Sequence, residues 1–196
     1  RSQNTLSNIV RDSINEQQSI SKNELSSSFS KLFRPGYWST SETNPKVLAQ
    51  ADKFLNQIKS YVEKNPGVTE LTFYINAGES RIPNSDAETG TTVGEGDLAK
   101  KRAGSLTKYL QNKLKELFPN LRITAAAVNT KIGKTKYDEA GKNAFAAYKK
   151  AKYDISQLSA DQQQIVNSFL KDQYINVSIR QTGYAIECNS QPIARS

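Results

Sequence analysis

Apolar residues of this chain change their spacing repeatedly between residues 44 and 127, and this alternation restricts the fold more than any other feature. In 45–62 and 98–117 they recur every three or four residues, the spacing of amphipathic helices with one buried face. In 69–75 they alternate with polar residues, as in a half-buried strand, and we interpret the short stretch 121–127 as another strand. The predicted order is therefore helix, strand, helix, strand.

Local signals support both helices. Asn44 is expected to cap the first helix and Pro45 to take its first position, while Asn65-Pro66-Gly67 is expected to end it. The second helix is expected to follow Gly96. Its predicted buried stripe consists of Leu98, Ala103, Leu106, Leu110, Leu114 and Leu117.

Strands at both ends complete the predicted sheet. One is expected over 24–30 and the last over 174–180, where Ile175, Val177 and Ile179 alternate. Helices of this length allow the strands to lie side by side with both helices on one face. We therefore predict an α+β fold, a β/α/β/α-β two-layer sandwich with the helices on one face of a mixed sheet, plus an inserted helical segment.

The chain is expected to divide into a main body and two polar ends. The predicted parts are a leader or linker helix over 1–23, a domain over 24–182 with its insertion at 131–172, and a tail over 183–196. No apolar run approaches the ~20 residues that cross a bilayer. We expect no transmembrane segment in this chain.

Composition excludes most hydrolytic chemistry. The chain has no histidine, so it lacks the commonest general base, the usual zinc ligand and any Ser-His-Asp triad. The one cysteine, Cys188, fits neither an internal disulfide nor a metal pattern. Acidic residues between Glu79 and Glu95 include candidates for a glycosidase-like carboxylate pair, but acidic side chains in a polar loop are usually solvated. We expect no enzyme activity, no metal and no cofactor.

The most informative candidate for a ligand contact is Arg102. It lies in the first turns of the second predicted helix, after a strand and a long polar loop over 76–96. Free backbone N–H groups and the planar guanidinium fork together suit a carboxylate. The alternative is that Arg102 is one more solvated cation beside Lys100 and Lys101.

The net charge of +8 favours acidic partners, and lysines gather in 130–152, where Tyr137, Tyr148 and Tyr153 are interleaved. Basic residues among aromatic residues can bind nucleic acid. Such a run is more often a solvated helix face. Beyond it, Ser159-Ala160-Asp161-Gln162 is a capping box that predicts one more helix.

The chain resembles the OmpA-like domain of outer-membrane anchor proteins, peptidoglycan-associated lipoproteins and the stator protein MotB. The resemblance lies in Leu32-Phe33-Arg34-Pro35-Gly36, in the Asn-Pro before the second strand, and in Leu98-Ala99-Lys100-Lys101-Arg102-Ala103, which matches the family's "LS-x-x-RA" block. It covers roughly 24–182 without the lysine-rich insertion. It implies a module that binds the peptide stem of peptidoglycan without covalent chemistry.

In that family an Asp and the Arg of "RA" hold the ionised ends of diaminopimelate. The Arg position is Arg102, while the Asp position falls on Ser80, with Glu79 beside it. A buried ammonium needs a carboxylate partner, which Glu79 supplies only if the loop shifts by one residue. Asn76 and the loop to Glu95 would shape the pocket. The family's final arginines are replaced in Tyr174-Ile175-Asn176.

These implications give a first hypothesis: a non-catalytic module in the periplasm, bound to peptidoglycan and anchoring an envelope assembly to the outer membrane or cell wall. The alternative is a structural subunit of a secretion or motility machine, or of a virion, that keeps the fold with a degenerate ligand site. A nucleic-acid-binding protein ranks below both.

Overall fold

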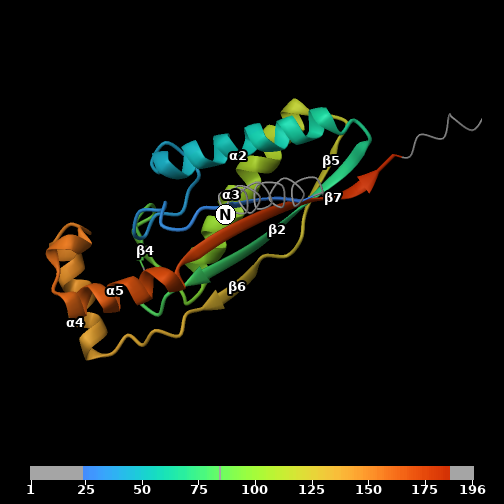
Figure 1. Ribbon diagram of the computed structural model, residues 1–196. Helices are drawn as coiled ribbons and strands as arrows, with labels where there is room; N and C mark the ends of the chain where they lie inside the picture. The colour runs from blue at the N-terminus through green and yellow to red at the C-terminus, as the bar shows by residue number, and fades with distance from the viewer. Residues whose placement is uncertain (1–23, 84, 186–196) are drawn as a thin grey trace, which may run out of the picture.

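The computed structural model describes residues 24–83 and 85–185 and has the predicted α+β architecture (Figure 1). A mixed sheet has the strand order β1 (Glu24–Ser28), β7 (Tyr174–Tyr184), β2 (Val68–Glu79) and β5 (Arg122–Ala125), with β6 (Asn129–Ile132) also paired to β2. Helices α2 (Pro45–Lys64) and α3 (Asp97–Leu117) pack against one face of the sheet. The expected helix over 1–23, and Cys188 in the tail, lie outside the described residues.

Both long helices begin where the sequence indicated. Asn44 occupies the N-cap position of α2 and Pro45 its first position, but the Asn44 side chain does not cap the helix; its Nδ2 donates to the carbonyl oxygen of Ser39 at 2.7 Å. In α3 the predicted apolar stripe is buried from Leu98 to Leu114. Leu117 was wrongly included: it is the last residue of α3 and is 46% exposed.

Strand β2 (Val68–Glu79) is longer than the prediction and is the centre of the sheet. Parallel to it, β5 (Arg122–Ala125) pairs with 70–73 and β6 (Asn129–Ile132) with 76–79. On its other side, antiparallel β7 (Tyr174–Tyr184) pairs with nearly all of β2 and extends past the predicted end. Residues 76–79 were expected in a loop. Instead they continue β2, because pairing with β6 and β7 satisfies their backbone N–H and C=O groups.

Strand β1 (Glu24–Ser28) pairs antiparallel with β7 at the edge of the sheet. It ends two residues before the prediction. The chain turns away just after it, because Lys31 has a φ of 64°, which no strand residue adopts.

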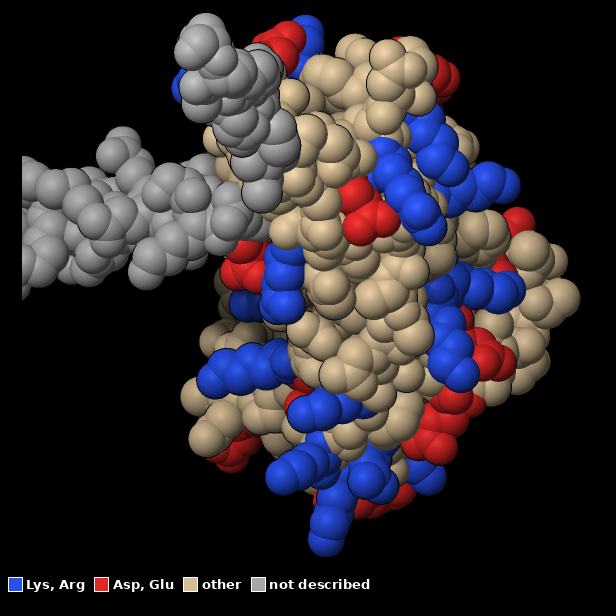
Figure 2. All heavy atoms as spheres, turned by 90° about the vertical axis from the view of Figure 1, so that its right-hand side faces the viewer, with Lys and Arg blue, Asp and Glu red and all other residues tan. Residues whose placement is uncertain are grey.

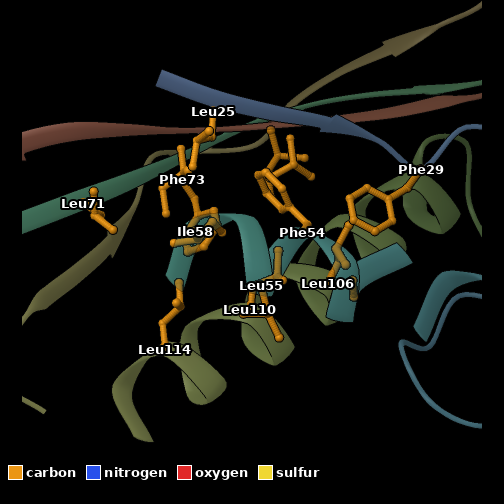
Figure 3. Close-up of a cluster of buried hydrophobic side chains, with 14 of the residues drawn as sticks. Leu25, Phe29, Phe54, Leu55, Ile58, Leu71, Phe73, Leu106, Leu110 and Leu114 are labelled. Atoms are coloured by element: carbon orange, nitrogen blue, oxygen red, sulfur yellow. The ribbon is translucent and has the colours of Figure 1, made fainter. Parts of the chain in front are cut away.

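The core lies between the sheet and the two helices (Figure 3). Phe54 of α2 and Phe73 of β2 are fully buried, and the rings of Phe29 and Phe54 meet edge to face with centroids 6.5 Å apart. Each side chain of this size contributes about 1.5–3 kcal/mol when it leaves water. This shared core holds the start of α3 against the end of β2.

The predicted loop over 76–96 is more ordered than expected. Its middle forms a small hairpin of β3 (Ser85–Asp86) and β4 (Thr91–Thr92). Asp86 is fully buried, where it accepts hydrogen bonds from Trp38 Nε1 at 2.9 Å and from Lys101 Nζ at 2.6 Å. The lone tryptophan therefore packs on the body, through Asp86. The expectation that the acidic residues of this loop are solvated was wrong for Asp86, because Trp38 and Lys101 satisfy its carboxylate in the interior.

The inserted helices stand at one end of the sheet, beside the start of β7 (Figure 1). They are α4 (Glu139–Lys150), the short 3₁₀ helix η1 (Ile155–Gln157) and α5 (Ala160–Asp172), around a small core that includes Ala144, Leu158 and Val166. The capping box is confirmed in part: Gln162 N–H donates to Ser159 Oγ at 3.2 Å. Lys131 and Ile132, placed in the predicted insertion, belong to β6.

Among the described residues, no helix combines the length and the apolar character needed to cross a membrane.

Candidate functional site

Arg102 is a buried cation and not a solvated surface charge. It is 7% exposed, in the second turn of α3. Its Nε donates to the carbonyl oxygen of Tyr37 at 2.8 Å and its Nη2 to that of Arg34 at 3.2 Å. Its Cζ lies 4.9 Å from the centre of the Phe33 ring. The side chain therefore joins α3 to the loop that precedes α2.

Burial lowers the pKa of Arg102 to about 10, and the negative charge of Glu79 opposes this shift. The guanidinium remains charged at neutral pH. Its planar fork has five N–H donors. Within the described part of the chain, no hydrogen bond uses Nη1, so the side chain keeps donor capacity beyond its two backbone partners.

Glu79, the last residue of β2, is a buried carboxylate at the start of α3. Its Oε2 accepts a hydrogen bond from Gly96 N–H at 2.6 Å and its Oε1 accepts one from Ala99 N–H at 2.9 Å. Gly96 stands at the N-cap with a φ of 85° and has no side chain to cap with. The carboxylate from the strand takes over that role and meets the positive end of the helix dipole.

Arg102 and Glu79 line one cavity of about 250 Å³ at the end of the sheet. Phe29, Phe33 and Leu98 contribute walls from the body. The inserted helices and the turn after α4 form the opposite side through Phe145, Tyr148, Tyr153 and Leu170. A positive and a negative side chain thus face one partly apolar hollow from two adjoining elements.

The other residues predicted for the site lie elsewhere. Ser80 is buried and its Oγ accepts a hydrogen bond from Gln173 Nε2 at 2.9 Å, but it does not line the cavity. Asn76 is exposed, and its Oδ1 accepts from Asn129 Nδ2 at 3.2 Å. Asn76 alternates with the core residues Ile75 and Ala77 along β2, so it belongs to the sheet face without helices. Glu95 is exposed and also outside the cavity.

Of the predicted site residues, the structure brings Arg102 and Glu79 together at the cavity, and not Ser80. Strand alternation explains this choice, because Glu79 follows Ile75 and Ala77 on the helix-covered face. The substituted positions Tyr174 and Ile175 also line the cavity. Sequence reasoning missed the aromatic wall from the insertion, although its tyrosines had been noted as a possible nucleic-acid contact.

The charged side chains that line the cavity are those of Lys31, Glu79 and Arg102. The two cations can hold a carboxylate and the anion an ammonium. In the described ranges, no cluster of three or more His, Cys, Asp or Glu side chains is placed to hold a metal ion. On the face shown in Figure 2, lysines and arginines lie in groups with acidic side chains among them.

Comparison with known proteins adds no assignment to this geometry. No model of a known protein family matches the chain, and no curated protein matches it. The resemblance to OmpA-like domains stays a prediction.

Proposed function

We propose that this chain is a non-catalytic binding module whose cavity holds the free amino-acid end of diaminopimelate in a peptidoglycan stem peptide. The observation that carries the proposal is the pairing of buried Arg102 and buried Glu79 at one cavity of about 250 Å³. In this role the protein would anchor an envelope assembly to the cell wall from the periplasm.

The unused hydrogen-bonding capacity of the pair matches such a ligand. Arg102 keeps free donors for a carboxylate, and a carboxylate such as that of Glu79 has about four acceptor positions, of which two are occupied. A zwitterionic amino-acid end supplies the complementary carboxylate and ammonium. Each charge-assisted hydrogen bond contributes about 1.5–3 kcal/mol, so a few of them are enough for measurable binding.

The size of the cavity supports a side-chain end as the ligand. Pockets for drug-sized molecules measure about 300–1,000 Å³, and this cavity is smaller. A whole disaccharide therefore fits less well than the end of one amino acid. The apolar walls from Phe29 and Leu98 are suited to the methylene chain between the two ends of diaminopimelate.

Isothermal titration calorimetry with two stem peptides tests the proposal directly. One peptide carries meso-diaminopimelate and the other carries L-lysine at the same position, which keeps the ammonium but lacks the neighbouring carboxylate. We expect binding of the first and at least tenfold weaker binding of the second, the ratio that about 1.4 kcal/mol produces. Equal affinity for both, or no affinity for either, contradicts the proposal.

Two variants locate the binding. Glu79→Gln removes the charge that meets the ammonium but keeps acceptor and donor groups near Gly96, and it is expected to weaken binding. Arg122→Gln is the matched control, because Arg122 is exposed and pairs only with Glu70, at 3.0 Å, in the described chain. Folding of each variant is checked by circular dichroism before titration.

A structural subunit remains the second candidate, and one observation favours it. Both charged side chains already have internal partners: Arg102 bonds to backbone carbonyls and Glu79 to backbone N–H groups. These bonds alone can explain their burial. A virion or secretion-machine subunit would bind neither stem peptide, while its Arg102 variants would still lose stability.

A further inference from the structure

A second, wider cleft adjoins the Arg102 cavity. It encloses about 720 Å³ and runs between the 31–37 loop, the start of α2 and the turn after α4. It shares five lining residues with the cavity: Lys31, Phe33, Pro35, Tyr148 and Tyr153. A ligand held at Arg102 can therefore continue past these side chains into the cleft.

The cleft is positively charged. Three exposed cations line it, Lys31, Arg34 and Lys46, and the lining residues include no Asp or Glu. The Arg34 guanidinium is held over the Tyr37 ring, 4.0 Å from its centre, and its Nη1 donates to the carbonyl oxygen of Thr43 at 3.4 Å. Three cations in a lining without acidic residues favour an anionic occupant.

Two of the five residues shared by the two hollows have an uncommon backbone conformation. Lys31 has a φ of 64° and Tyr153 a φ of 63°, in the left-handed region that non-glycine residues seldom adopt. The Tyr148 and Tyr153 rings meet edge to face with centroids 5.2 Å apart. Surrounding structure must fix such residues, and strain of this kind gathers at ligand sites.

We propose that this cleft binds a second carboxylate of the same ligand, so that the module recognises an acidic peptide and not diaminopimelate alone. The proposal rests on the function proposed above. In a stem peptide, the residue before diaminopimelate is a γ-linked glutamate whose α-carboxylate is free. That carboxylate lies within one residue of the group in the cavity and meets Lys31, Arg34 or Lys46.

A nucleic-acid strand is also negatively charged, like the acidic peptide, and is the alternative occupant of the cleft. We favour the peptide because the cleft opens directly into a cavity that contains a buried acid, Glu79, which repels phosphate. A peptide with one ammonium and two carboxylates matches both hollows at once. Binding of a nucleic-acid strand is therefore treated as an alternative outcome of the experiment below.

Calorimetry with three ligands tests the inference. They are meso-diaminopimelate, γ-D-glutamyl-meso-diaminopimelate with its glutamate α-carboxylate free, and the same dipeptide with that carboxylate amidated. We expect the free dipeptide to bind about tenfold more tightly than the amidated one. Lys46→Gln, at a residue that lines the cleft but not the cavity, is expected to reduce this difference and to leave the affinity for diaminopimelate unchanged.

Lys59→Gln is the matched control, because Lys59 is exposed on α2 and lines neither hollow. If diaminopimelate binds but both dipeptides bind equally, the inference is wrong and the proposed function stands. If none of the three ligands binds, both are wrong. A single-stranded oligonucleotide whose binding is weakened by Lys46→Gln, with both dipeptides bound equally, would assign the cleft to nucleic acid and overturn the inference.

Discussion

Arg102 Nε donates a hydrogen bond of 2.8 Å to the carbonyl oxygen of Tyr37, and so one cation fastens α3 to the loop that borders both hollows. The same guanidinium faces the cavity. Glu79 combines two roles in the same way, since it caps α3 and faces the cavity from β2. Under the proposed function, stability and ligand binding are coupled at this site, so each variant needs both measurements.

Replacing Arg102 by lysine is expected to destabilise the fold even though the charge is kept. Lysine lacks the planar fork that reaches the carbonyl oxygens of Tyr37 and Arg34 together. Loss of one charge-assisted hydrogen bond costs about 1.5–3 kcal/mol of the free energy of unfolding, measured by urea denaturation. The exposed control Arg122→Lys should cost less than about 0.5 kcal/mol. Equal costs for the two variants would contradict a structural role for Arg102.

Asp86 is expected to make the protein sensitive to acid. Burial would raise its pKa, but hydrogen bonds from Lys101, from the Thr89 backbone and from Trp38 outweigh this effect and hold the pKa well below its usual range. A carboxyl group whose pKa is lowered by folding stabilises the protein above its ordinary pKa of about 4, and this stabilisation is lost as the pH falls below it.

Thermal unfolding between about pH 6 and pH 2 measures this dependence. Asp86→Asn removes the titrating group, so we expect its melting temperature to fall less steeply with acid than that of the unaltered protein. Parallel pH curves for the two proteins would show that the Asp86 pKa does not differ between the folded and unfolded chains.

The hydroxyl of Tyr109 is expected to ionise at a higher pH than an ordinary tyrosine. Burial, together with the hydrogen bond that its hydroxyl donates to Asp52 Oδ1 at 2.6 Å, raises the pKa of Tyr109 to about 12. Because a tyrosine pKa is about 10 in an unfolded chain, the stabilisation is complete below pH 10 and is lost as the pH rises through 12. Ultraviolet titration should show a tyrosine with a pKa of about 12 that is absent in Tyr109→Phe, and Lys113→Gln should leave it in place. Burial also raises the pKa of Tyr61 and Tyr148, and these two should titrate alike in all three proteins. Identical titration curves for the two proteins would contradict the prediction.

Gly104→Ala is expected to stabilise the protein. Gly104 is exposed inside α3, and an added Cβ meets no atom within 4 Å. Alanine is favoured over glycine in a helix interior by about 1 kcal/mol, which urea denaturation can measure. Gly78→Ala is the opposite case, because its Cβ would collide with the Tyr174 ring and lie 2.5 Å from the carbonyl oxygen of Asp172. Destabilisation by Gly104→Ala would contradict the open surroundings of this residue.

Local rules predicted α2 and α3 because helix capping and apolar spacing act within one or two turns. Pro45 at the first position of α2, and Ser159 capping α5, both follow from residues only a few positions away. The ends of β1, β2 and β7 were predicted less well. Their lengths depend on a partner strand, and β2 continues to Glu79 only because β6 and β7 pair with its last residues.

The candidate site likewise combines features that local sequence predicts with features that depend on distant segments. The position of Arg102 on the first turns of a helix followed from sequence, whereas its carbonyl partners lie 65 and 68 residues away and could not be found locally. Glu79 and Ser80 were the two candidates for the residue that faces the ligand's ammonium. The alternation of β2 placed Glu79 at the cavity, and Ser80 instead bonds to Gln173.

By itself, the sequence determined the α+β class, the two helices and their buried faces, since these depend on spacing along the chain. Only the tertiary structure decided that Arg102 and Glu79 share a cavity with aromatic side chains from an insertion more than forty positions further along the chain. The reason is that contacts between distant segments follow from packing of the whole core, and no periodicity within one segment encodes them.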